Sequence, residues 1–122
     1  MNTCPDHVAH PKAIVAIWNV ANRGKTETLR ELAHLLLRTY PNHRPISPGL
    51  PPNTGDFRLV IAIDGLIVAI ESQGDPHTAL QKRLVELVEK EKADLIFCAT
   101  RTKGETVSAV KHIAQMGYEE VW

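Results

Sequence analysis

The chain has 122 residues, 43% hydrophobic and 23% charged, and its 14 basic and 14 acidic residues cancel to a formal net charge of zero. This length suits one domain with a single core, and zero net charge gives no general attraction to nucleic acid or to an acidic membrane. No apolar run approaches the roughly 20 residues of a membrane span, residues 1–7 lack the segments of a secretory signal, and two cysteines are too few for a disulfide framework. We therefore expect one cytoplasmic domain, 1–122, with residues 1–11 as a flexible tail.

The first half of the chain predicts a strand, a helix and a hairpin. Residues 13–18 form a continuous apolar run, typical of a strand buried on both faces. From Thr26 to about Tyr40, apolar residues recur every three and four positions, which predicts an amphipathic helix. A Pro-, Asn- and Gly-rich stretch to about Asp56 then shows no periodicity. Two apolar runs, 58–63 and 66–71, follow with only Asp64-Gly65 between them, a strong signal for a β-hairpin.

The second half alternates helices and strands. Asp75 and Pro76 suit the start of a second helix, and residues 94–99 read as a strand. A third helix runs to Met116 with Gly117 as its C-cap, and residues 118–122 suit a last strand. The order β-α-ββ-α-β-α-β predicts a three-layer α/β domain with about five mostly parallel strands and one antiparallel hairpin at 57–71.

A short polar loop after the first strand gives the clearest functional signal. It ends in Gly24-Lys25-Thr26, where the first helix begins. Backbone N–H groups, a lysine ammonium, a hydroxyl and a helix N-terminus together suit the binding of phosphates and a metal ion. Over residues 13–38 the chain resembles the P-loop NTPases, with Asn19 in place of the first glycine of the Walker A motif.

The resemblance implies a central parallel sheet, binding of ATP or GTP with Mg²⁺, and hydrolysis or phosphoryl transfer. It implies that Lys25 neutralises the β- and γ-phosphates and that Thr26 ligates Mg²⁺. No guanine signature of the small GTPases is present, which favours ATP. The nucleotide-binding residues implied are Asn19, Val20, Ala21, Asn22, Arg23, Gly24, Lys25, Thr26 and Glu27.

Two acidic residues, Asp64 and Glu71, follow apolar strands and are candidates for the Walker B role. If the stretch before residue 57 returns to the loop edge, the first hairpin strand runs antiparallel and the second runs back. Glu71 then lies beside Gly24-Lys25-Thr26, and Asp64 lies at the opposite edge. We expect Glu71 to act as a metal-binding or catalytic residue.

Other residues are weaker candidates. Arg101, with Lys103 at the start of the third helix, is expected to bind an anion or stabilise the charge being transferred, together with Lys25. Gln73 could orient water or bond the loop backbone, and Asp75 is better explained as a helix N-cap. Cys4, His7 and His10 are weak candidates for a metal site.

The sequence leaves three functions open. The favoured one is Mg²⁺-dependent hydrolysis of a nucleoside triphosphate. The alternatives are a phosphotransferase acting on a small acceptor and a non-catalytic nucleotide-binding switch. A homodimer or a protein partner is compatible with all three, whereas nothing in the composition supports nucleic-acid binding.

Overall fold

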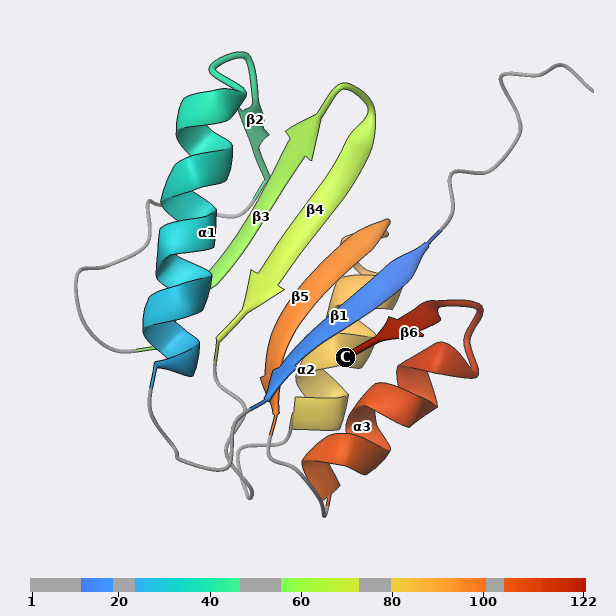
Figure 1. Ribbon diagram of the computed structural model, residues 1–122. Coiled ribbons are helices and arrows are strands. Elements are labelled where there is room, and N and C mark those ends of the chain that lie inside the picture. The colour runs from blue at the N-terminus through green and yellow to red at the C-terminus, as the bar shows by residue number, and fades with distance from the viewer. Residues whose placement is uncertain (1–11, 19–23, 47–55, 73–79, 101–104) are drawn as a thin grey trace, which may run out of the picture.

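The computed structural model describes residues 12–18, 24–46, 56–72, 80–100 and 105–122, apart from the side chains of residues 18, 25, 105 and 106. These residues form an α/β fold with one mixed sheet, as predicted (Figure 1). The elements in chain order are β1 (Ala13–Trp18), α1 (Lys25–Thr39), β2 (Arg44–Pro45), β3 (Arg58–Ile63), β4 (Leu66–Glu71), α2 (Leu80–Glu89), β5 (Leu95–Thr100), α3 (Glu105–Ala114) and β6 (Glu119–Val121).

The strand order in the sheet is β2-β3-β4-β5-β1-β6. Strands β4, β5, β1 and β6 pair in parallel, while β3 is antiparallel to both β2 and β4. The predicted hairpin is confirmed, with the pairs Arg58–Glu71 and Ile63–Leu66 at its two ends. Its turn residues Asp64 and Gly65 have φ values of 50° and 85°, and such positive values at both positions match the twist of a two-residue hairpin.

The prediction of about five strands was wrong, because the described residues form six. The additional strand is β2, two exposed residues that pair with Ala62 and Ile61 of β3. A strand this short has no alternation that a sequence could show. Proline donates no hydrogen bond to the strand ladder, so Pro45 suits this position at the edge of the sheet.

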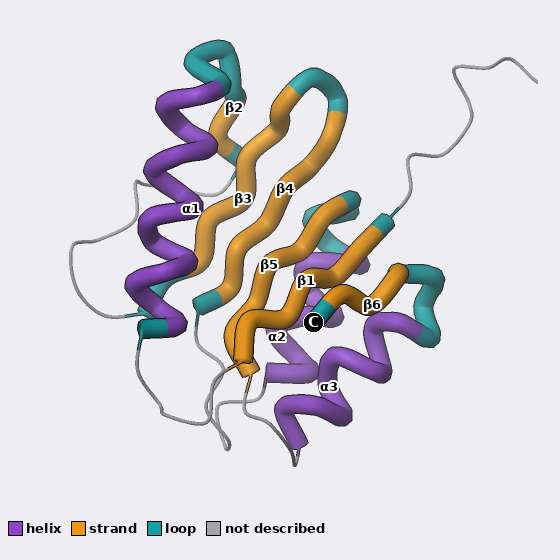
Figure 2. Tube along the Cα trace, viewed as in Figure 1, coloured by secondary structure: helices purple, strands orange, loops and turns teal. Residues whose placement is uncertain are grey.

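Helices cover both faces of the sheet, giving the three layers that the alternation predicts (Figure 2). Leu29 and Ala33 of α1 pack on one face against Leu59, Ile61 and Ile70. On the other face, α2 and α3 pack over a cluster that includes Leu84, Leu87, Val110, Ile113 and Ile96. Strands β1, β3, β4 and β5 are covered on both faces, which explains their continuous apolar sequences.

Cys98 on β5 is a completely buried part of this second core. Burial, with a smaller contribution from the negative charge of Glu71, raises the pKa of its thiol from 9.0 to about 12. The unfolded chain therefore loses this proton at a lower pH than the native protein does, and the native state is destabilised as pH rises above about 9.

The Cys4→Ser change leaves Cys98 as the one thiol of the chain. In this background we expect the unfolding free energy to fall more steeply between about pH 9 and about pH 11 than it does when Cys98→Ala is added. The difference in slope should approach about 1.4 kcal/mol per pH unit, because the native thiol retains a proton that the unfolded thiol loses. Urea unfolding followed by circular dichroism measures both slopes. Equal slopes would show that Cys98 ionises normally in the folded protein.

Candidate functional site

The candidate site lies at the carboxyl edge of the sheet, the edge at which β1, β4 and β5 end. Gly24 precedes α1 with a φ of 82°, a left-handed conformation that glycine adopts without strain. Helix α1 then begins at Lys25, and the N–H of Thr28 donates to the carbonyl of Gly24 at 2.8 Å. The first N–H groups of a helix have no partner within it, and the helix dipole favours an anion at this end.

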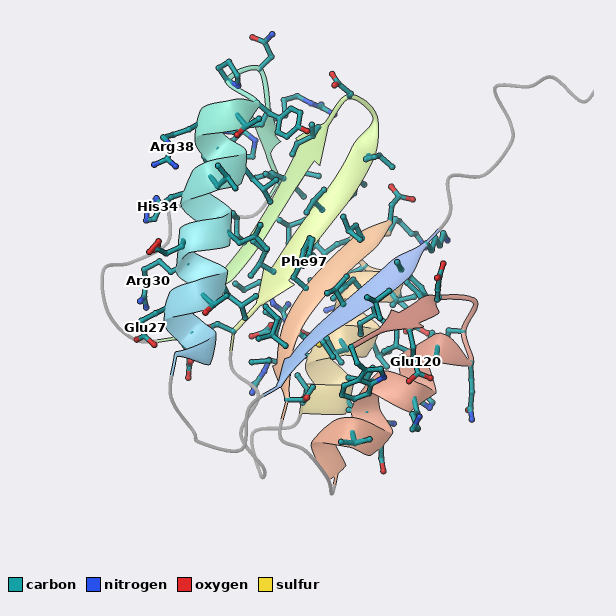
Figure 3. All side chains as sticks on the ribbon, viewed as in Figure 1. Glu27, Arg30, His34, Arg38, Phe97 and Glu120 are labelled. Carbon is teal, nitrogen blue, oxygen red and sulfur yellow. The ribbon has the colours of Figure 1, made fainter. Side chains whose placement is uncertain are left out.

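Most of the predicted phosphate loop lies outside the described residues. The loop residues concerned are Asn19, Val20, Ala21, Asn22 and Arg23. The other candidates that lie outside the described residues are Arg101, Lys103, Gln73, Asp75, Cys4, His7 and His10. Lys25 is described by its backbone alone. Glu27 is described fully, and its side chain is 70% exposed and 3.9 Å from the guanidinium of Arg30. Figure 3 shows Glu27 on the outer side of α1, whereas the Arg30 side chain is only 11% exposed and its guanidinium lies 5.8 Å from the ring centroid of Phe57.

A carboxylate that the sequence analysis did not select lies beside Thr26. The hydroxyl of Thr26 donates to Oδ1 of Asp56 at 3.2 Å, and the hydroxyl of Ser72 donates to the same oxygen at 3.2 Å. Ser72 is buried and accepts a 2.7 Å hydrogen bond from the N–H of Phe57. Because that contact occupies an acceptor site of Ser72, its proton is directed at Asp56. The carboxylate is thus held between the first turn of α1 and the end of β4.

Glu71 lies at the same edge as Gly24, as predicted, and Asp64 lies at the opposite edge. There, Asp64 and Tyr40 line a small cavity by the end of α1. The register aligns Glu71 with Cys98 and Cys98 with Ala16, two residues before the end of β1. At roughly 3.3 Å per residue, Glu71 lies about 7 Å below that end. The side chain is buried.

Two arginines surround the Glu71 carboxylate. Nε of Arg58 donates to Oε1 at 2.7 Å, and Nε of Arg83 lies 3.7 Å from Oε2. Arg58 also donates through Nη1 to Glu86 at 3.2 Å and through Nη2 to the carbonyl of Arg83 at 3.3 Å. Burial opposes the charge on Arg58, but its hydrogen bonds and ion pairs with Glu71 and Glu86 outweigh burial and raise its pKa.

A pocket of about 540 Å³ opens beside these ion pairs, between the strand ends and α2. Its lining combines the polar residues of the edge with one turn of the helix, and consists of Asp56, Phe57, Arg58, Glu71, Lys82, Arg83 and Glu86. Asp56 therefore contacts both Thr26 and this pocket.

The sequence contained a signal for Asp56. The acidic candidates were residues at the ends of strands, because parallel strands end at one edge of an α/β sheet. An antiparallel strand starts at that edge, so Asp56, two residues before β3, takes the corresponding place. Arg58 could have been found by the same reasoning, as the hairpin pairs it with Glu71.

No protein-family model, curated protein or solved structure matches this chain. Among the described residues, no group of three or more His, Cys, Asp or Glu side chains is arranged to hold a metal ion. Nor does any helix in this part of the chain have the length and apolar character needed to cross a membrane.

We expect Glu71→Gln to lower the unfolding free energy by about 3 kcal/mol, because it leaves two partly buried guanidinium groups without their carboxylate. Glu86→Gln is the matched control. The Glu86 side chain is 35% exposed, and its ion pair among the described residues is with Arg58, so Glu86→Gln should cost less than about 1 kcal/mol. Urea unfolding of the three proteins tests this, and equal stabilities of the two variants would show that Glu71 does not organise the edge.

Proposed function

We propose that the protein binds a nucleoside triphosphate, ATP rather than GTP, with Mg²⁺ at the start of α1 and hydrolyses it. The observation that supports this most is the Thr26 hydroxyl in the first turn of α1, held by Asp56 and preceded by the left-handed Gly24. Phosphates at this place would meet backbone N–H groups and the positive end of the helix dipole. Lys25 would add its charge to the β- and γ-phosphates.

The residues at this edge fit a magnesium ion. Mg²⁺ prefers oxygen ligands, keeps several of its waters and binds few protein groups directly. Thr26 offers a hydroxyl oxygen whose proton is already donated to Asp56, which leaves its lone pairs for a cation. When bound, Mg²⁺ would neutralise charge on the transferring phosphoryl group. Asp56 would hold the Thr26 hydroxyl in place and add a negative charge beside the metal.

Glu71 and Arg101 remain predictions in this scheme. Glu71 would act through water on the metal or as a base. Its carboxylate forms ion pairs with Arg58 and Arg83, so one of these ion pairs would have to break first. The contacts therefore favour Asp56 as the carboxylate nearest the metal. Arg101 would stabilise charge on the phosphoryl group.

A phosphotransferase is the second candidate, and the pocket beside Asp56 favours it. About 540 Å³ lies within the range of small-molecule sites and could hold an acceptor next to the phosphates. An acceptor that changes the rate at which triphosphate is converted to diphosphate would identify a transferase. Tight binding of nucleotide without turnover would instead identify a switch.

We expect Lys25→Ala to weaken binding of Mg²⁺-ATP by about 10- to 100-fold, since it removes a charge-assisted contact with the phosphates. Calorimetric titration of ATP and GTP, each with Mg²⁺, followed by phosphate release on the same samples, measures binding and turnover. Asp64→Asn is the control and should change neither, because Asp64 lies in the turn at the opposite edge. Unchanged affinity in Lys25→Ala would exclude the proposed site.

We expect Asp56→Asn to weaken binding of Mg²⁺-ATP while leaving binding of ATP in the presence of EDTA nearly unchanged. The amide lacks the negative charge that Asp56 would place beside the metal, but it can still accept a hydrogen bond from Thr26. Titrations with and without Mg²⁺ separate the two effects. Equal losses of affinity in both titrations of Asp56→Asn would contradict a role of Asp56 toward the metal.

Glu71→Gln should leave the affinity for Mg²⁺-ATP unchanged and reduce the rate of phosphate release.

A further inference from the structure

We propose that the pocket between α2 and the ends of β3 and β4 binds a small molecule carrying a carboxylate or phosphate group, with Arg83 and Lys82 as its anion-binding residues. This site is distinct from the start of α1, and among the described residues Asp56 both lines the pocket and contacts Thr26. The inference does not depend on the proposed nucleotide site, because it rests on the charges that line the pocket.

The acidic side chains of the pocket already have partners. Glu71 and Glu86 accept hydrogen bonds from Arg58, and Asp56 accepts them from Thr26 and Ser72. Arg58 is committed as well, because Nε, Nη1 and Nη2 each donate a hydrogen bond. These four side chains therefore form the fixed wall of the pocket.

The charged side chains that remain among the described lining residues are positive. Arg83 is 3.7 Å from Glu71, which is too far for a hydrogen bond, and its Nε and Nη2 are buried without a hydrogen-bond partner in the described part of the chain. Lys82 is exposed at the mouth of the same pocket. A planar guanidinium with donors to spare and an adjacent ammonium recognise carboxylate and phosphate oxygens, and a buried donor gains most from acquiring an acceptor.

The arrangement also favours a particular charge and set of polar groups on the ligand. Glu86 pairs with Arg58 and repels an anion that approaches on that side, so Lys82 and Arg83 are the positive groups that the anion would meet. Asp56 and Glu86 would in turn accept hydrogen bonds from hydroxyl or amino groups elsewhere on the ligand. A small polar molecule with one anionic group and at least one hydroxyl or amino group would meet both the basic and the acidic side chains of the pocket.

The test uses the whole chain without nucleotide. Inorganic phosphate and acetate are titrated separately while NMR follows the Nε–Hε signal of Arg83, identified by its loss in Arg83→Lys. We expect a saturable shift of that signal, and the anion with the higher affinity shows which group the ligand carries. Thr26→Val, which alters the start of α1, should leave the shift intact.

Two variants keep the proposal falsifiable. Lys82→Gln changes an exposed residue and should weaken binding by about 3- to 10-fold at unchanged stability, the loss of one exposed charge contact. Lys90→Gln, at an exposed position after α2 outside the pocket, should have no effect. A shift that does not saturate, or one that is equal in Lys82→Gln and the unaltered protein, would overturn the proposal.

Discussion

The register of the β3–β4 hairpin determines which polar groups meet at the start of α1. Asp64 and Gly65 fix the turn, and the pairing it imposes places Arg58 opposite Glu71 on the face covered by α2. A shift of one residue in the pairing would turn one of the two side chains to the α1 face, toward the cluster of Leu59, Ile61 and Ile70, and separate it from the other. The ion pair and the apolar alternation therefore require the same register. Asp56 and Ser72, which flank the paired strands, are brought together by that register as well.

The two carboxylates at this edge have different physical environments. Glu71 is buried, faces α2 and interacts with guanidinium groups, so separating it from them would expose uncompensated charges in a poorly solvated region. Asp56 is exposed, and within the described part of the chain it accepts hydrogen bonds from the hydroxyls of Thr26 and Ser72. A hydroxyl can keep its hydrogen bond to a carboxylate while its lone pairs turn to a cation. This difference makes Asp56 the more accessible group for a ligand at α1 and Glu71 the better anchor for α2.

Regular elements with a strong pattern could be predicted from the sequence. The apolar run at 13–18, the period of α1 and the Asp64-Gly65 turn each correspond to one local structure. The direction of the hairpin was expected on the condition that the preceding stretch returns to the loop edge, which its length allows. Strand β2 could not be found, because two exposed residues have no pattern. Asp56 was missed although β3 was expected to run antiparallel, because only the acidic residues that follow strands were considered. The partners of Glu71 come from α2, and such contacts depend on how the helix packs.

Asp56 belongs to both proposed sites, which has a thermodynamic consequence if both are occupied. Its Oδ1 is held by the hydroxyls of Thr26 and Ser72, while the residue also lines the pocket that contains Arg83. A ligand in the pocket that donates a hydrogen bond to Asp56 would draw electron density from the carboxylate and weaken its hold on Thr26. A cation at Thr26 would likewise draw electron density from Asp56 and weaken the hydrogen bond that Asp56 accepts from the ligand in the pocket. Coupling of this kind is reciprocal, so each ligand would change the affinity of the other by the same factor.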